Sequence, residues 1–231
     1  MRAIFLIGLN FVRTQWIVVA VMSVYILASV NLYLPGGHRN DFFFLLRLHS
    51  GYTISVIVMM AIPVLQTERK SRRILAVLSK GIYRWQYLSG LICGCAMSAA
   101  LFCILLGVVV LWLGQINGVP VNGLSAVMMS LFCCCLVAAT TGLFFAVFLQ
   151  PLLAILATSV TLMLPFILEA IGWPGSEFFP LGALFKAISL EAGFQMARVP
   201  LLIGTAILQT LIFWIAAVVV FNRRDVTISP E

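Results

Sequence analysis

Charge is what this chain most lacks. Only 9% of its 231 residues are charged and 63% are hydrophobic, whereas a soluble domain of this size carries about 25% charged residues. Such a composition cannot cover a surface that faces water, so the bilayer is the solvent that fits. Inside a bilayer the backbone must satisfy its own hydrogen bonds, either in helices or in a closed barrel. The long continuous apolar runs of this chain argue against a barrel of short alternating strands and predict an all-α integral membrane protein.

Motifs for catalysis are also missing. The sequence has no G-x-x-x-x-G-K-[ST] phosphate loop, so we do not expect the chain to hydrolyse ATP itself. It has no H-E-x-x-H and no G-x-S-x-G motif, which argues against a metalloenzyme or a membrane protease. Its two histidines, His38 and His49, are both expected near the outer face. We therefore predict no catalytic residue, no metal and no cofactor in this chain.

The six cysteines all lie inside apolar runs. A disulfide framework would place cysteines in exposed loops, and a metal site would need His or carboxylate at ligand spacing. Packing of helix against helix by small residues is the interpretation that fits. The six are Cys93, Cys95, Cys103, Cys133, Cys134 and Cys135.

Six apolar runs are long enough to span a membrane, which takes about 20 residues. The predicted spans are 16–34, 44–66, 88–113, 124–149, 152–171 and 201–221. Residues 1–14 are too short an apolar region for a signal peptide, and we expect an amphipathic helix in the inner interface. Residues 1–231 are predicted to form a single transmembrane domain with no soluble domain attached.

The basic residues predict the orientation. The net charge is +7, but the basic residues stand between apolar runs, so they indicate topology and contact with anionic lipid rather than binding of nucleic acid. Four basic residues, Arg47 among them, fall on one side of the predicted spans. Ten fall on the other side: Arg2, Arg13, Arg69, Lys70, Arg72, Arg73, Lys80, Arg84, Arg223 and Arg224. We therefore expect a multi-pass protein of the cell (inner or plasma) membrane, with both termini and the 68–84 loop in the cytoplasm.

The segment that joins the second and third spans is the most informative in the chain. Ile74, Leu75 and Leu78 share one helical face, and basic residues take much of the remaining surface. Such a segment fits a short lever that docks on a cytoplasmic partner. It also fits an ordinary interfacial helix held by anionic lipid.

The order of features around this segment resembles the permease subunits of type-2 ABC exporters. In that family an acidic residue ends the second span, and a coupling helix, a basic residue and a small residue at the third span follow. The matching positions here are Glu68, Ile74-Leu75-x-x-Leu78, Arg84 and Gly90. The ending Phe221-Asn222-Arg223-Arg224-Asp225-Val226 is also similar to the family's. Arg72-Arg73 stands where the family often has Gly-Thr.

The resemblance implies a fold, partners and a substrate route. It implies a coupling helix formed by the 68–84 segment, which includes Arg72 and Arg73, and re-entrant helices outside, between residues 177 and 199. A separate cytoplasmic ATPase would bind ATP and Mg, and a second permease subunit, identical or different, would complete a dimer. The substrate, expected to be hydrophobic or amphipathic and exported, would pass along the second and fifth spans. The candidate lining residues are Tyr52, Thr53, Ser55, Thr158, Ser159 and Thr161, which can equally serve helix–helix hydrogen bonding.

Two other functions stay open on the sequence. A stand-alone six-helix carrier or channel would need ionisable groups at mid-membrane, and Glu169, near the outer end of the fifth span, comes closest. A membrane assembly or scaffold protein would use the basic loop to bind a partner without energy coupling.

Overall fold

The described part of the chain is almost entirely helical. The computed structural model describes residues 2–29, 39–70, 82–118, 121–173, 178–189, 193–194 and 196–223. Its helices are α1 (Arg2–Thr14), α2 (Trp16–Ala28), α3 (Arg39–Lys70), α5 (Arg84–Ile116), α6 (Leu124–Phe148), α7 (Pro151–Ala170), α8 (Pro180–Ala187) and α9 (Val199–Arg223). Two short strands, β1 (Ile188–Ser189) and β2 (Gly193–Phe194), and the 3-10 helix η3 (Met196–Arg198) lie between α8 and α9.

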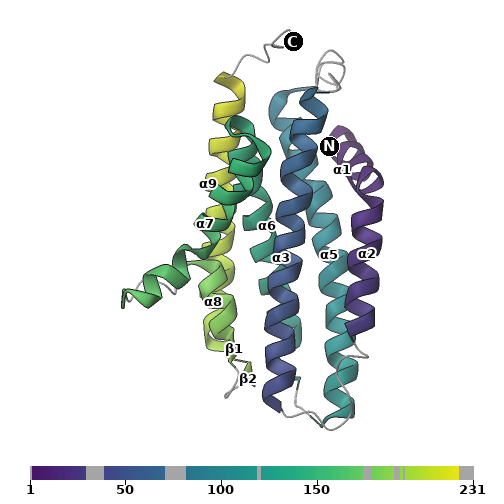
Figure 1. Cartoon of the computed structure of the whole chain (residues 1–231), viewed down its shortest axis with the longest axis vertical. Helices are drawn as coiled ribbons and strands as arrows, with labels where there is room; N and C mark the ends of the chain where they lie inside the picture. Colours follow the sequence, from purple (N-terminus) through teal and green to yellow (C-terminus); the bar gives the residue numbers. More distant parts are fainter. Residues whose placement is uncertain are drawn as a thin grey trace.

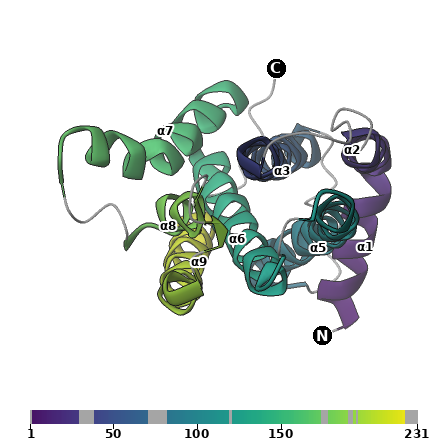
Figure 2. The same ribbon diagram turned by 90° about the horizontal axis from the view of Figure 1, so that it is seen from below.

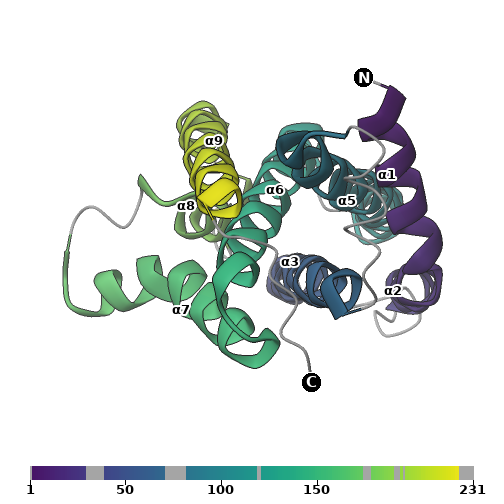
Figure 3. The same cartoon turned by 90° about the horizontal axis from the view of Figure 1, so that it is seen from above.

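The long helices form a bundle around α6 (Figure 1). Seen from above, α3, α5 and α9 surround α6, with α1 and α2 beyond α5 and with α7 and α8 on the opposite side (Figure 3). The view from below shows the same order (Figure 2). Burial agrees with this arrangement, because 72% of the apolar window of α6 is buried inside the chain, against 17% in α7 and 11% in α9. The helices α7 and α9 therefore present most of their surface to whatever surrounds the molecule.

Five described helices are long and apolar enough to cross a membrane, and the count rises to six if α1 and α2 together form one bent span. The protein is thus a multi-pass α-helical membrane protein. Each predicted span from 44–66 onward lies on one of the five long helices, except that the spans 124–149 and 152–171 extend one residue past α6 and α7. The predicted span 16–34 starts with α2, but α2 ends at Ala28, and residues 30–34 lie outside the described part.

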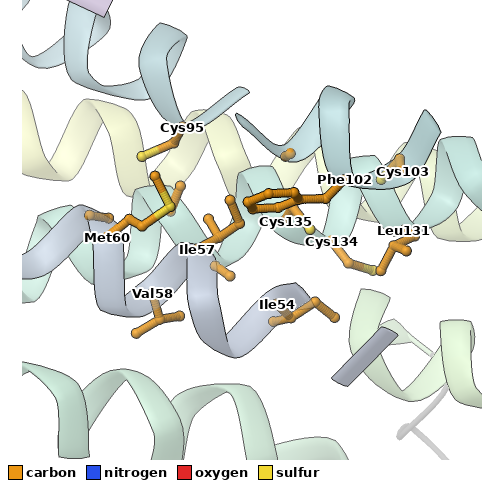
Figure 4. Close-up of a cluster of buried hydrophobic side chains, with 14 of the residues drawn as sticks. Ile54, Ile57, Val58, Met60, Cys95, Phe102, Cys103, Leu131, Cys134 and Cys135 are labelled. Atoms are coloured by element: carbon orange, nitrogen blue, oxygen red, sulfur yellow. The ribbon is translucent and has the colours of Figure 1, made fainter. Parts of the chain in front are cut away.

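The core joins α3, α5 and α6 through apolar side chains and thiols (Figure 4). Ile57 and Met60 of α3 and Phe102 of α5 belong to one cluster of buried side chains, and each is at most 1% exposed. Five of the six cysteines are buried and all six are free thiols. The prediction that they serve packing agrees with this placement, since small residues let membrane helices approach closely.

Small residues also allow α1 to pack closely against α5. A Cβ added at Gly90 would lie 2.6 Å from Ile7, and one added at Gly94 would lie 2.6 Å from Phe11. Real Cβ atoms do not approach so closely, so only glycine permits this crossing. The helix α1 then turns by 68° into α2, which suits an interfacial segment followed by a membrane segment.

The connection between α7 and α9, where re-entrant helices are predicted, is described in part. Gly172 lies just past the end of α7, and its φ of +81° allows a Schellman motif in which Trp173 N–H donates to the Leu168 carbonyl. The chain then forms one described α-helix, α8, with Pro180 at its start, and continues as the strand pair in which Ile188 lies opposite Phe194. Ile188, whose φ of −97° and ψ of 75° are not helical, ends α8 after eight residues. No second α-helix forms in the described part of 177–199.

Replacing Gly94 with alanine should displace α1 and lower stability by about 1–3 kcal/mol, because the new methyl group would overlap Phe11. The matched control is Gly204→Ala on α9, where nothing lies within 4 Å of an added Cβ. That control should be neutral or stabilising by up to about 1 kcal/mol. Thermal unfolding in detergent measures both, and equal midpoints for the two variants would contradict the α1–α5 contact.

Candidate functional site

A groove with a volume of about 630 Å³ lies between α3, α7 and α8. Ligand sites commonly have volumes of about 300–1,000 Å³, so the space suits a small molecule or a single hydrocarbon chain. Most of the side chains along it are apolar, and Arg47 is the one charged residue among them. The lining residues include Phe44, Arg47, Tyr52, Ser55, Met59, Ser159, Leu181 and Phe185.

The α3 wall of this groove follows from helical spacing. Phe44, Leu48, Tyr52, Ser55 and Met59 recur every three or four residues, so they share one face of α3. All five are exposed, while the opposite face of α3 is buried against α5 and α6. The groove wall is therefore a side of α3 that the described residues leave uncovered.

Arg47 fixes α8 against α3. Its Nε donates to the Ile188 carbonyl at 2.6 Å, and its Nη2 donates to the Phe185 carbonyl at 2.5 Å. These carbonyls belong to the last turn of α8 and the residue after it, where no further helical N–H follows to bond them. A guanidinium, with several donors in a fixed fork, suits such a pair of acceptors. Arg47 thereby closes the end of α8 and places a positive charge in the groove wall.

A second polar contact joins α7 to α8. Lys186 Nζ lies 3.3 Å from Glu169 Oε1, and both side chains are partly exposed. Glu169, the carboxylate considered above as a pathway group, is therefore paired with a cation of α8. Phe166 of α7 also packs edge-on against Phe185 of α8, with ring centroids 5.5 Å apart. These contacts hold the two walls of the groove together.

One aromatic side chain of α2, that of Tyr25, packs against two aromatic rings of α3. Tyr25 stacks on His49 with ring centroids 5.2 Å apart and meets Tyr52 edge-on at 5.8 Å. His49 is buried, and its Nδ1 bonds to the Leu45 carbonyl at 2.9 Å. Within the described residues its Nε2 has no hydrogen-bond partner. The contact between Tyr25 and Tyr52 orients a ring that lines the groove.

The structure brings together three of the six residues predicted to line a substrate route. Tyr52, Ser55 and Ser159 line the groove. Thr53 and Thr158 are buried and donate to the carbonyls four residues earlier in their own helices. Thr161 does the same and borders a much smaller cavity near Pro180. Sequence reasoning missed the role of Arg47, because the residue was counted only as one of the outer basic charges.

The predicted coupling residues fall into two groups. Glu68 and Arg84 are described, whereas Arg72, Arg73, Ile74, Leu75 and Leu78 lie outside the described residues. Glu68, near the end of α3, accepts a hydrogen bond from the Tyr87 hydroxyl of α5. Arg84, at the start of α5, donates to the carbonyls of Phe221 and Asn222 at 2.8 and 3.1 Å.

Phe221 completes this arrangement at the end of α9. Its ring stacks against Tyr87 with centroids 6.5 Å apart and lies under the Arg84 guanidinium at 5.8 Å. We call Glu68, Arg84, Tyr87 and Phe221 the anchor cluster. It links described residues on either side of 71–81 to the last turn of α9.

Comparisons with protein-family models, with curated proteins and with solved structures found no match for this chain. Its class, a multi-pass α-helical membrane protein, rests on its own long apolar helices. Within the described residues, the apolar groove with Arg47 in its wall and the polar anchor cluster are the features on which a function can be argued.

Replacing Arg84 with glutamine should loosen the end of α9, because the two carbonyl contacts and the ring contact would be lost. The expected cost is about 1.5–3 kcal/mol, as for hydrogen bonds made by a charged group. Hydrogen exchange in detergent should show faster exchange in the last turns of α9. Arg13→Gln, at an exposed position on α1, is the control, and equal exchange in both variants would contradict the anchor cluster.

Proposed function

We propose that this chain is the membrane-spanning subunit of an ATP-driven transporter that exports a hydrophobic or amphipathic substrate. In this proposal a separate cytoplasmic ATPase binds ATP and Mg, docks on the 68–84 segment and drives the spans between two conformations. The chain contributes no catalytic residue. It contributes two states that differ in their affinity for substrate, which is what a coupled conformational change requires.

The observation that carries the proposal is the anchor cluster. A basic segment that only rested on lipid would need no fixed contact with distant helices. Here the residues flanking 71–81 bond to one another and to α9: Glu68 to Tyr87, and Arg84 to the Phe221 and Asn222 carbonyls. Gln66 adds a bond from its Nε2 to the Leu149 carbonyl at 2.7 Å, at the corner between α6 and α7. A displacement of 71–81 would therefore be passed to α3, α5, α7 and α9 together.

The uncovered faces of α3 and α7 support pairing with a second subunit. On α3 the exposed stripe runs from Phe44 to Met59, and on α7 Leu152, Leu156, Val160 and Met163 form another at helical spacing. Both stripes border the groove, at Phe44 and Met59 on one side and at Met163 on the other. A second subunit laid against them would enclose the groove between the two chains.

Copurification tests the proposed coupling. Tagged chain isolated from native membranes should bring down a protein that carries the G-x-x-x-x-G-K-[ST] motif. Ile74→Ser, Leu75→Ser and Leu78→Ser together should abolish its recovery, because the apolar docking face would be lost. The matched control changes Phe5, Leu6 and Leu9 to serine, since these exposed residues of α1 have the same spacing.

Two results would count against the coupling. One is that the wild-type chain recovers no such ATPase, which would favour a stand-alone carrier. The other is that the triple variant of the 68–84 segment recovers the ATPase in the wild-type amount. The segment would then be interpreted as an interfacial helix held by lipid.

Labelling of intact cells tests the proposed orientation. A cysteine at Lys80 should react with a membrane-impermeant maleimide only after the cells are permeabilised, since the basic loop is expected inside. A cysteine at the exposed Asn122, between α5 and α6, should react without permeabilisation. The reverse pattern would overturn the topology and the docking of a cytoplasmic ATPase with it.

A further inference from the structure

The groove between α3, α7 and α8 has one charge at one end and hydrocarbon along the rest. Met59 lies twelve positions after Arg47 on α3, so its Cα is about 18 Å farther along the helix axis. Along that distance the lining side chains are apolar except Tyr52, Ser55 and Ser159. This length is close to half of a hydrocarbon core of about 30 Å. The groove therefore has the dimensions of one acyl chain from one leaflet.

None of the carboxylates that the structure describes pairs with Arg47. Within the described residues the one ion pair joins Lys186 to Glu169. Arg47 bonds instead to two carbonyls, which use two of its five N–H donors and, being neutral, do not cancel its charge. Charged side chains in membrane segments pair with backbone carbonyls or with opposite charges, and Arg47 has the first kind of partner among the described residues. An anion at its remaining donors would supply the second.

We propose that this groove binds an acidic membrane lipid, with one acyl chain along α3 and α7 and the anionic headgroup at Arg47. The exposed side chains of Phe44, Tyr52 and Met59 leave the groove open toward the surroundings of the bundle, so a lipid can enter from the side. Phosphate and guanidinium form short charge-assisted hydrogen bonds. Under the proposed function, on which this step rests, an acidic lipid-like amphiphile is then the cargo class.

A second copy of the chain fits the Arg47 end of the groove less well than an acidic lipid does. Residues 42–67 contain no Asp or Glu, and in α7 the one carboxylate, Glu169, is already paired with Lys186. Two copies meeting through these faces would bring apolar side chains to the groove and leave Arg47 without an anion. A second subunit can enclose the groove and still leave the headgroup position to a lipid.

Native mass spectrometry of the full-length chain in detergent tests the inference. The chain is titrated with phosphatidylglycerol and with phosphatidylcholine that carry the same acyl chains. The acidic lipid should bind about tenfold more tightly, as one charge-assisted contact implies. Arg47→Gln should bring its affinity down to that of phosphatidylcholine, and Arg47→Lys should keep part of the preference.

Two tryptophan variants test the hydrocarbon part of the site separately from α8. Ser55→Trp fills the groove without touching Arg47 and should weaken binding of both lipids. Ile104→Trp, at an exposed position on α5, should leave both affinities unchanged. If Arg47→Gln does not fold, the comparison of the two lipids on the wild-type chain and on Ser55→Trp decides the matter.

Equal affinity for the two lipids, or an unchanged preference in Arg47→Gln, would overturn the inference. So would a Ser55→Trp variant that changes the oligomeric state and leaves lipid binding intact, since the groove would then belong to a second copy. The lipid assay uses the chain without any ATPase, so its outcome does not depend on whether an ATPase copurifies. A failure to bind acidic lipid overturns the lipid site alone, and a failure to recover an ATPase counts against the proposed function alone.

Discussion

The absence of water from the hydrocarbon layer is the constraint on which this structure depends. Every backbone N–H and C=O there must find a partner within the protein, so the chain is built from long helices. Because lipid tails are as apolar as leucine, the helices are held by close packing rather than by burial from water. Gly90 and Gly94 under α1, and the thiols between α3, α5 and α6, provide that packing.

The same constraint explains why a charge lies beside the groove. α8 ends after eight residues, and the carbonyls of Phe185 and Ile188 then need donors. Arg47 supplies them from α3. A neutral donor could make those hydrogen bonds too, but a guanidinium brings a charge that its carbonyl partners do not neutralise. In this way a local requirement of the backbone produces a feature able to attract an anion.

Sequence patterns located most of the helices because composition and breakers act locally. Pro151 and the Schellman turn at Gly172 mark the two ends of α7, close to the predicted 152–171. Charged residues mark both ends of α3 and the start of α5. The same patterns placed only part of the site. Ser55 and Thr53 look alike in sequence, yet one lines the groove and the other is buried, because the rotation of α3 is set by its neighbours. Arg47 resembled an ordinary topology charge until α8 was placed against it.

The sequence by itself determined that this is a multi-pass helical membrane protein, because a composition with so few charges leaves hydrocarbon as its only solvent. It also determined where the helices lie, since proline, glycine and charge interrupt apolar runs wherever the chain goes. Only the tertiary structure decided that Arg84 reaches the end of α9, 137 residues away, and that α8 closes a groove against α3. Those contacts depend on how helices rotate and cross, which no local pattern encodes.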